Sequence, residues 1–277
     1  MALIGLPLRR RHSEVMHNAA FRHYGIDARY ELRPLESDQL EKFFTEVRER
    51  GWLGFQVTAP HKQAAMTLVD EIEPEAAAIG AINSGLRTTE GRLVGFNTDS
   101  PGFARSVSGD LGMTLTGASV VVVGAGGAAR AVVHACLGAG AARVHVGNRT
   151  PGHASDLRTE IGSPLVTAGG MDDELDAALR DADLVVNATT VGMTTLGVPF
   201  EVESLPAHAR VLDLVYVPAV TDLLAAAIGR GLRAINGMGM LIAQAAIAFE
   251  RWTGVTDAEP VMRRAIEGLA EDTVATA

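Results

Sequence analysis

Two charged residues stand where an α/β enzyme would place a proton-transfer pair. Lys62 follows the apolar stretch LGFQVT and Pro60, and Asp99 follows the stretch RLVGF within GFNTD. Ligand sites of α/β sheets lie beyond the carboxyl ends of strands, so both residues are well placed for one. A desolvated ammonium can release its proton, which makes Lys62 a candidate donor or acceptor with Asp99 as its partner. The structural alternatives are a buried ion pair and a helix cap formed by Asp99.

Lysine is rare in this chain, which strengthens the case for Lys62. Only two lysines, Lys42 and Lys62, occur among 24 lysines and arginines. The composition thus favours arginine wherever a plain positive charge suffices, yet a guanidinium effectively never loses its proton. Lys42 falls on the polar face of an expected helix, so Lys62 is the one suited to proton transfer.

A glycine-rich stretch, VVVGAGGAARAVVHA, provides a second chemical motif. Gly124, Gly126 and Gly127 lie between a continuous apolar strand and a helix, so backbone amides and the helix dipole can face a pyrophosphate. The alternative is a tight turn without a ligand. The strand-before, helix-after context favours a dinucleotide-binding loop.

The end of the next strand, ARVHVG, indicates which dinucleotide binds. An NAD site would carry Asp or Glu there, whereas this sequence has Asn148, Arg149 and Thr150. A guanidinium suits the extra phosphate of NADP, so we expect NADP rather than NAD. The alternative is a helix capped by Thr150, with Arg149 in solvent.

The elements that would position these residues predict an α/β protein. In the first hundred residues β-rich runs alternate with amphipathic stretches, and INSGLRT and RLVGFN read as a hairpin. From residue 119 the pattern restarts with ASVVVVG, typical of a strand buried on both faces of a parallel sheet. We therefore expect an N-terminal α/β substrate domain and a Rossmann-type, doubly wound parallel-sheet domain.

Composition excludes several classes of partner. A net charge of −9, a pI near 5.4 and 5% aromatic residues argue against nucleic-acid binding.

The lone Cys136 fits a reducing compartment, and no apolar run is long enough for a membrane span, so we expect a cytoplasmic protein. We expect it to be a monomer or a homodimer. His12, His17 and His61 form no metal-ligand pattern, and no metal is predicted. A small hydroxy acid is the expected partner.

The segments VTAPHKQ, AIN, GFNTD, GAGGAAR, NRT, NATTVGM and GMGMLIAQA, in this order, resemble the shikimate dehydrogenase family. The resemblance spans nearly the full chain. It implies a substrate domain over residues 1–102, an NADP-binding Rossmann domain over 103–237, and C-terminal helices over 238–277 that pack back on the first domain. The site would lie in the cleft between the two domains.

The resemblance also implies residue roles. It makes Lys62 and Asp99 the catalytic pair. The residues expected to bind the substrate are Arg11, Ser13, Thr58, Asn83, Asn97, Tyr216 and Gln244. The residues expected to bind the cofactor are Gly124, Ala125, Gly126, Gly127, Ala128, Asn148, Arg149, Thr150, Thr189, Val215 and Gly237. For Gln244 the alternative is a hydrogen bond between packed helices.

One stretch, GLPLRRRHSEVMHN, departs from the family pattern. Where the family carries two serines that hold the substrate carboxylate, this chain has Arg11 and Ser13, and Glu14 replaces the following proline. A guanidinium binds a carboxylate bidentately, so Arg11 and Ser13 are predicted to hold an acidic group. Alternatively, Arg9 to Arg11 form an exposed cationic run with Arg11 paired to Glu14, ahead of a helix capped by Ser13.

These features predict an NADP-dependent oxidoreductase that reversibly oxidises a ring hydroxyl of shikimate or a shikimate-like alicyclic hydroxy acid. Because of Arg11, quinate, an amino-substituted analogue or another acid remains an alternative substrate. A methylenetetrahydrofolate dehydrogenase-like enzyme and a non-catalytic NADP or metabolite binder are further alternatives. The Lys62 context and the NTD motif argue against the former, and retention of both Lys62 and Asp99 argues against the latter.

Overall fold

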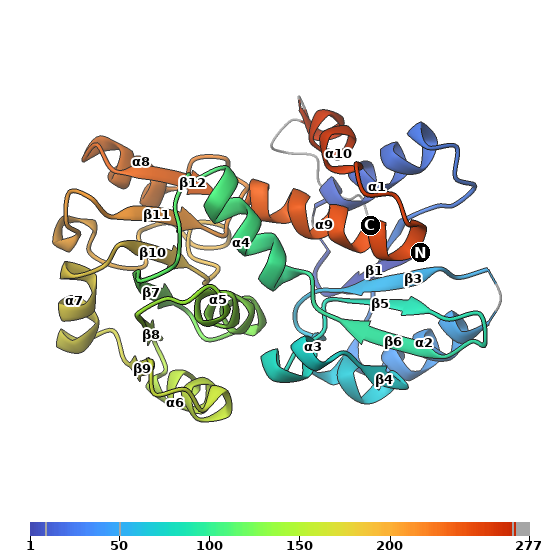
Figure 1. Cartoon of the computed structure of the whole chain (residues 1–277), viewed down its shortest axis with the longest axis horizontal. Coiled ribbons are helices and arrows are strands. Elements are labelled where there is room, and N and C mark those ends of the chain that lie inside the picture. The colour runs from blue at the N-terminus through green and yellow to red at the C-terminus, as the bar shows by residue number, and fades with distance from the viewer. Residues whose placement is uncertain (9, 50, 268, 270–277) are drawn as a thin grey trace. The chain divides into compact units, whose positions relative to one another are not determined.

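The structure is a computed structural model that describes residues 1–8, 10–49, 51–267 and 269 (Figure 1). The chain forms two compact units: unit 1 comprises Met1–Asp99 and Leu241–Ala277, and unit 2 comprises Ser100–Met240. The predicted divisions at residues 102 and 238 fall in the same two helices as these, α4 (Asp99–Gly109) and α9 (Met238–Thr253). Of the predicted C-terminal segment, residues 268 and 270–277 lie outside the described residues.

Unit 1 contains a mixed six-stranded sheet in the order β2-β1-β3-β5-β6-β4. Its strands are β1 (Ala2–Gly5), β2 (Glu31–Pro34), β3 (Gly54–Val57), β4 (Glu71–Ile72), β5 (Ser84–Arg87) and β6 (Leu93–Phe96). Strand β5 runs antiparallel to both β3 and β6, and the other neighbours are parallel. The predicted hairpin is thus the pair β5 and β6.

The helices of unit 1 cover both faces of strand β3. They are α1 (His12–His23), α2 (Leu40–Arg48), α3 (Pro74–Ile79), α9 and α10 (Glu259–Ile266), with short 3-10 helices at Ser37–Gln39 and Ala64–Leu68. Phe55 and Val57 join a core cluster with the apolar face of α2. Side chains alternate along a strand, so Gln56 faces the other way, where it contacts His17 of α1 and Gln244 of α9.

The C-terminal helices belong to unit 1 through specific contacts. Trp252 on α9 donates from Nε1 to the backbone oxygen of Gly85 at 3.0 Å. A Cβ at Gly54 would lie 2.5 Å from that indole nitrogen, so this close approach requires glycine there. Farther along, the Tyr24 hydroxyl bonds to Oδ1 of Asp257 at 2.9 Å.

Unit 2 contains a six-stranded, all-parallel sheet in the order β12-β11-β10-β7-β8-β9. Its strands are β7 (Ser119–Val123), β8 (Arg143–Gly147), β9 (Val166–Gly169), β10 (Leu184–Asn187), β11 (Arg210–Asp213) and β12 (Arg233–Asn236). Its further helices are α5 (Gly127–Gly138), α6 (Pro151–Ile161), α7 (Asp173–Arg180) and α8 (Asp222–Gly229), with a 3-10 turn at Val202–Ser204. This order has its topological switch between β7 and β10, as in a doubly wound dinucleotide-binding fold.

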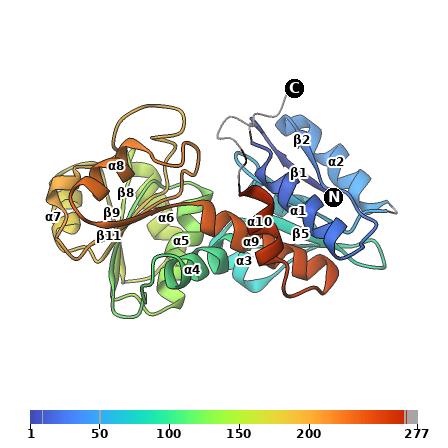
Figure 2. The same cartoon turned by 90° about the horizontal axis from the view of Figure 1, so that it is seen from above.

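The core of unit 2 explains the uninterrupted valine run of β7. Val120 and Val122 pack with side chains of α4, α5 and α6, while Val121 packs with side chains of α7 and α8 on the other face. Figure 2 shows the ribbons of these helices around the sheet of unit 2. Both faces of the strand are therefore covered, as its sequence predicts. Across the described residues, no helix is both long and apolar enough to cross a membrane.

Candidate active site

Lys62 and Asp99 form an ion pair in unit 1. Lys62 Nζ donates to Asp99 Oδ2 at 2.5 Å, and the two side chains are 16% and 10% exposed. They meet because two antiparallel pairings, through β5, make β3 and β6 run in the same direction, so both strands end at one edge of the sheet. The pair is therefore largely sheltered from bulk water.

Two asparagines hold Asp99 in place. Asn83 Nδ2 donates to Asp99 Oδ1 at 2.8 Å, which leaves Oδ2 for Lys62. Asn97 Oδ1 accepts from the Asp99 backbone N–H at 2.9 Å at the start of α4, and its Nδ2 donates to the Ala81 carbonyl at 2.9 Å. Both asparagines are buried beside the ion pair, and their binding of a substrate stays a prediction.

Gln244 joins the same cluster from α9. Its Oε1 accepts from Gln56 Nε2 at 2.9 Å and from the Thr98 hydroxyl at 3.2 Å. Thr98 in turn accepts from Asn83 Nδ2 at 2.9 Å. The structure therefore brings together Lys62, Asp99, Asn83, Asn97 and Gln244, five of the residues predicted for the site.

Arg11 adopts the arrangement that was the alternative to carboxylate binding. Its Nε donates to Glu14 Oε2 at 2.7 Å, and the Arg11 side chain is 47% exposed. Arg9, the first member of the expected cationic run, lies outside the described residues. The expected cap by Ser13 is wrong, because α1 starts at His12 and Arg11 occupies the N-cap position without a side-chain cap bond. Ser13 lies in the first helical turn and is buried, and Thr58 follows β3 half-buried.

The predicted phosphate loop lies at the carboxyl end of β7. Gly124 has φ +114°, and a Cβ there would lie 2.9 Å from the carbonyl carbon of Ala188, so glycine is required. Gly126 is the N-cap of α5, no side chain caps this helix, and a Cβ at Gly126 would meet nothing within 4 Å. The first-turn amides of α5, at Gly127 and Ala128, therefore have no side-chain cap, as expected of a helix start that binds an anion, and Ala125 lies half-buried beside them.

Arg149 lies just after β8, exposed to solvent. In the described part of the chain its guanidinium forms no ion pair or hydrogen bond with other residues, and no carboxylate follows the strand directly. Asn148 Nδ2 donates to the Thr150 carbonyl at 2.9 Å, which shapes the turn. Thr150 is the N-cap of α6, but its side chain makes no cap bond. This turn can therefore offer an uncommitted guanidinium to a phosphate.

A buried carboxylate organises the loops that follow β10 and β11. Asp213 accepts hydrogen bonds from the Thr221 hydroxyl at 2.6 Å, from Asn187 Nδ2 at 2.8 Å and from the Val215 N–H at 3.0 Å. Asn187 Oδ1 in turn accepts from the Thr189 hydroxyl at 2.7 Å. Burial raises the pKa of Asp213 above its ordinary value. Thr189 and Val215, both predicted to bind the cofactor, are held by this cluster.

Two further predicted residues also lie in unit 2. Gly237 follows β12, and a Cβ there would collide with the Leu214 carbonyl. Tyr216, predicted to bind the substrate, lies half-buried in the loop after β11. Its substrate role stays a prediction.

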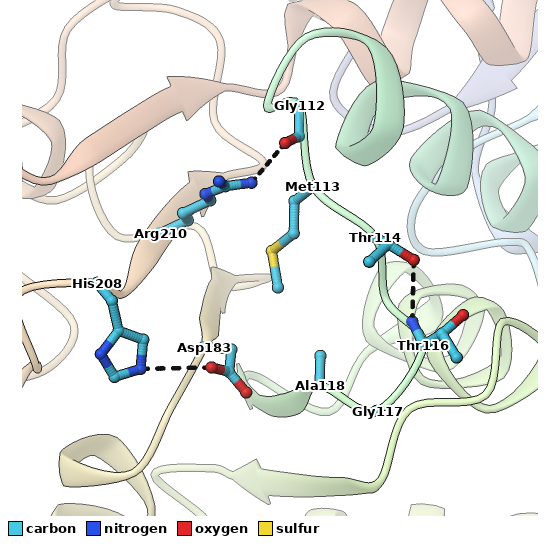
Figure 3. Close-up of a pocket in the computed structure, with 9 residues that line it drawn as sticks. All are labelled: Gly112, Met113, Thr114, Thr116, Gly117, Ala118, Asp183, His208 and Arg210. Atoms are coloured by element: carbon cyan, nitrogen blue, oxygen red, sulfur yellow. Dashed lines mark hydrogen bonds and ion pairs between the residues drawn. The ribbon is translucent and has the colours of Figure 1, made fainter.

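A pocket of about 440 Å³ lies at the opposite edge of the unit 2 sheet, where β7, β10 and β11 begin (Figure 3). It is lined by Gly112, Met113, Thr114, Thr116, Gly117, Ala118, Asp183, His208 and Arg210. Its charged groups are engaged with the protein: Arg210 donates to the Gly112 carbonyl at 2.7 Å, and His208 lies 3.3 Å from Asp183 (Figure 3). None of the predicted site residues lines this pocket.

Comparisons with known proteins match most of the chain. Three family models fit: the shikimate dehydrogenase substrate binding domain over residues 3–84, shikimate/quinate 5-dehydrogenase over 106–213, and the shikimate 5'-dehydrogenase C-terminal domain over 237–267. The shikimate dehydrogenase (NADP(+)) of Geobacter sulfurreducens is 42% identical over 270 residues, which are 95% of this chain and 94% of the relative. The chain belongs to the shikimate dehydrogenase family.

Solved structures of shikimate dehydrogenase relatives share the two-unit fold. The shikimate 5-dehydrogenase from Thermus thermophilus, in complex with NADP(H) and shikimate, is 38% identical with a TM-score of 0.83, over 95% of this chain and 98% of that one. The quinate dehydrogenase from Corynebacterium glutamicum, in complex with NAD, is 31% identical with a TM-score of 0.89, over 97% and 98%. The predicted α/β fold class and the predicted family are both confirmed.

Sequence reasoning missed three residues in this shikimate dehydrogenase fold. Gln56 and Thr98 link Gln244 to the ion pair, and Asp213 organises the loops of unit 2. Gln56 can be recognised in the sequence, since it is the polar residue inside the apolar run GFQV. A polar side chain inside a buried strand needs partners, and that requirement could have identified it.

Proposed function

We propose that this protein is an NADP-dependent shikimate dehydrogenase, which interconverts 3-dehydroshikimate plus NADPH and shikimate plus NADP. The observation that carries the proposal is the sheltered Lys62–Asp99 pair at the ends of β3 and β6. An ammonium at this point can exchange a proton with a substrate oxygen. The family relationship supports shikimate over quinate, because relatives 39–42% identical carry the name shikimate dehydrogenase (NADP(+)).

The roles of the two catalytic residues follow from their contacts. During reduction the Lys62 ammonium gives a proton to the carbonyl oxygen and becomes an amine, and during oxidation that amine takes the proton of the ring hydroxyl and becomes the ammonium again. Asp99 binds one N–H of the ammonium and so orients the other two toward the ligand. Asn83 and Asn97 keep the Asp99 carboxylate in register with Lys62.

The residues of unit 2 would hold the cofactor. The amides of Gly126 to Ala128 would bind the pyrophosphate, and Arg149 would bind the phosphate that distinguishes NADP from NAD. Asn148 and Thr150 would shape that turn, while Thr189, Val215 and Gly237 would line the nicotinamide end. NADP, when bound, supplies the hydride acceptor of the reaction.

The substrate carboxylate is proposed to bind Arg11 and Ser13, with Thr58, Tyr216 and Gln244 contacting the ring hydroxyls. Arg11 is half-exposed, so its guanidinium can turn from Glu14 to a ligand at small cost, since an exposed ion pair contributes little to stability. Replacing Arg11 by Ser is expected to raise the KM for shikimate. An unchanged KM for shikimate and for quinate would remove Arg11 from the site.

The test of the function is direct. Purified protein is assayed for reduction of NADP, with NAD in parallel, on shikimate, quinate and an amino-substituted shikimate, with the Lys62→Ala variant as control. We expect turnover of shikimate with NADP and none by the variant. Turnover of quinate alone would overturn the substrate assignment, and NADP binding without turnover of any acid would indicate a binding protein.

We further propose a monomer or homodimer that works in the cytoplasm. The buried thiol of Cys136 supports a reducing compartment, because it has no partner for a disulfide in this chain. Sedimentation of the purified protein would measure the oligomeric state. A larger assembly would contradict the proposal.

A further inference from the structure

The Gln56 amide has all of its hydrogen-bonding capacity in use. It is 2% exposed within β3. Its Oε1 accepts from the Tyr30 hydroxyl at 2.5 Å and contacts His17 Nε2 at 3.2 Å. Its Nε2 donates to Ser84 Oγ at 3.3 Å and to Gln244 Oε1 at 2.9 Å. An amide bound on all sides cannot rotate without breaking several bonds.

The groups at Oε1 decide which way this amide points. Burial raises the pKa of Tyr30 well above its ordinary value, so its hydroxyl keeps its hydrogen and must donate it. Burial also lowers the pKa of His17 to about 3, so the ring is neutral, and its Nε2 fits the Gln56 oxygen as the nitrogen that holds the hydrogen. A reversed Gln56 would place an N–H group against the Tyr30 hydroxyl, which would then lose its acceptor. Its oxygen therefore faces Tyr30 and His17, and its nitrogen faces Gln244.

The orientation of the Gln56 amide determines the orientation of the Gln244 amide. With Gln56 Nε2 as a donor, the oxygen of Gln244 must face it, and that oxygen also accepts from Thr98 at 3.2 Å. Gln244 Nε2 donates one hydrogen to the Leu241 carbonyl at 2.9 Å. The Gln244 oxygen is thereby turned toward the protein, and one amide hydrogen of Gln244 is left.

We propose that Gln56 is a positioning residue that fixes Gln244 as a hydrogen-bond donor to the substrate. The inference rests on the proposed function, because it requires Gln244 to contact the substrate. The substrate atom opposite Gln244 is then an acceptor, such as a hydroxyl, carbonyl or carboxylate oxygen. An ammonium group at that ring position is rejected, since it has hydrogens to donate and no lone pair.

The test is a double-mutant cycle on KM and kcat for shikimate with saturating NADP. Gln244→Met is expected to raise KM about 10-fold, the effect of losing one hydrogen bond. Gln56→Met removes the constraint and keeps the side-chain length, and it is expected to raise KM about 5-fold with kcat within about 2-fold. In the Gln244→Met background the Gln56 substitution is expected to add nothing, because the two residues act as one unit.

Two more variants control for folding. Gln39→Met makes the same substitution at an exposed residue before α2 and is expected to leave KM unchanged. Tyr30→Phe removes only the hydroxyl that orients Gln56, and it is expected to raise KM about 2-fold to 3-fold. It keeps the inference testable should Gln56→Met fail to fold. A loss of thermal stability without a change in KM, in either variant, would assign Gln56 a purely structural role.

The outcomes separate this inference from the proposed function. If Gln56→Met raised KM equally in the unaltered protein and in the Gln244→Met variant, the positioning role would be overturned, while shikimate turnover would remain intact. An unchanged KM in Gln244→Met would remove Gln244 from the substrate site, and the inference with it. Absence of shikimate turnover in the unaltered protein would overturn the proposed function itself.

Discussion

The two units hold their functional residues by opposite means. In unit 1 a buried chain of neutral groups, running through Gln56, Gln244 and Thr98, ends at an ion pair of side chains. In unit 2 a single buried carboxylate, Asp213, collects donors from Asn187 and from the loops around it. The first arrangement orients side-chain atoms, and the second fixes the course of the backbone.

This difference matches what each unit has to bind. The proposed proton transfer needs a reactive side chain at a defined place, and the neighbours of Lys62 in unit 1 would hold it there. The proposed binding of a pyrophosphate needs free backbone amides, and unit 2 has the uncapped start of α5 at Gly126, directly after the tight turn at Gly124. The contrast predicts that substitutions in unit 1 change rates and substrate binding, whereas those in unit 2 change cofactor binding.

The largest expected effect is on catalysis in unit 1. Lys62→Ala is expected to lower kcat for shikimate oxidation by about 1000-fold, because it removes the ammonium that exchanges the hydroxyl proton. Its affinity for NADP, measured by fluorescence titration, should stay unchanged. The control is Lys42→Ala, which removes the other, exposed lysine of the chain. A parallel loss of NADP affinity would contradict the prediction that substitutions in unit 1 leave cofactor binding unchanged.

The next effect concerns the choice of cofactor in unit 2. Arg149→Ala is expected to weaken NADP binding by about 10-fold to 100-fold, the range for a hydrogen bond to a charged group. NAD binding should not change. Arg143→Ala, at the start of the same strand, is the matched control, since that arginine pairs with Asp181. Equal losses for both cofactors would show that Arg149 does not read the extra phosphate.

Two glycines of the phosphate loop separate folding from binding. Gly124→Ala is expected to destabilise the protein by about 1–3 kcal/mol, because of its positive φ and the nearby Ala188 carbonyl. Gly126→Ala should keep the unfolding temperature, since its Cβ meets nothing within 4 Å, yet weaken NADP binding about 10-fold. Thermal unfolding and NADP titration of both variants check this. Full NADP affinity in the folded Gly126→Ala variant would contradict the loop assignment.

The buried His17 in unit 1 is expected to make the folded protein less stable at low pH. Burial lowers the pKa of His17 from 6.5 to about 3, so between these pH values the unfolded chain binds a proton that the folded chain does not. The folded state therefore loses stability as the pH falls from about 6.5 to about 3, by up to about 1.4 kcal/mol per pH unit. Urea unfolding at pH 7 and pH 4.5 should show this slope reduced in His17→Phe. An equal slope in both proteins would refute it.

The smallest effect is expected from Asp213 in unit 2, whose contribution to stability decreases as the pH rises. Burial raises the pKa of Asp213 above 3.8, so the folded state holds this proton more tightly than the unfolded state does. That contribution to stability is present at low pH and is lost as the pH rises through the folded-state pKa. Asp213→Asn removes the titration and keeps one of the two acceptor oxygens. The stability of the unaltered protein relative to this variant should fall as the pH rises from 4, in the same urea experiment.

Local patterns in the sequence predicted much of the fold and part of the site. The four valines before Gly124 predict a strand covered on both faces, and the glycines after it predict the helix start at Gly127. Each of these features is decided within about a dozen residues, where side-chain period and glycine geometry dominate. The Arg11–Glu14 pair, three residues apart on a helix, was also foreseeable as an alternative.

Contacts between distant segments could not be read in the same way. Gln56 and Gln244 are 188 residues apart, and Asn187 and Asp213 are 26 apart. Such pairs exist only because sheet register and helix packing bring the segments together, and no local preference encodes the distance. The boundary of α1 was misplaced for a related reason, since the helix starts at His12 without the side-chain cap expected of Ser13.

The split composition of unit 1 has a consequence for how the protein is made. Unit 2 is one continuous stretch, Ser100–Met240, so all of it has been synthesised before Leu241 is added. Unit 1 is complete only after its final segment has been synthesised, because His17, Tyr30 and Gln56 all contact α9. A chain interrupted before residue 241 would carry a finished cofactor-binding half and an uncovered, aromatic-rich half that chaperones and proteases recognise.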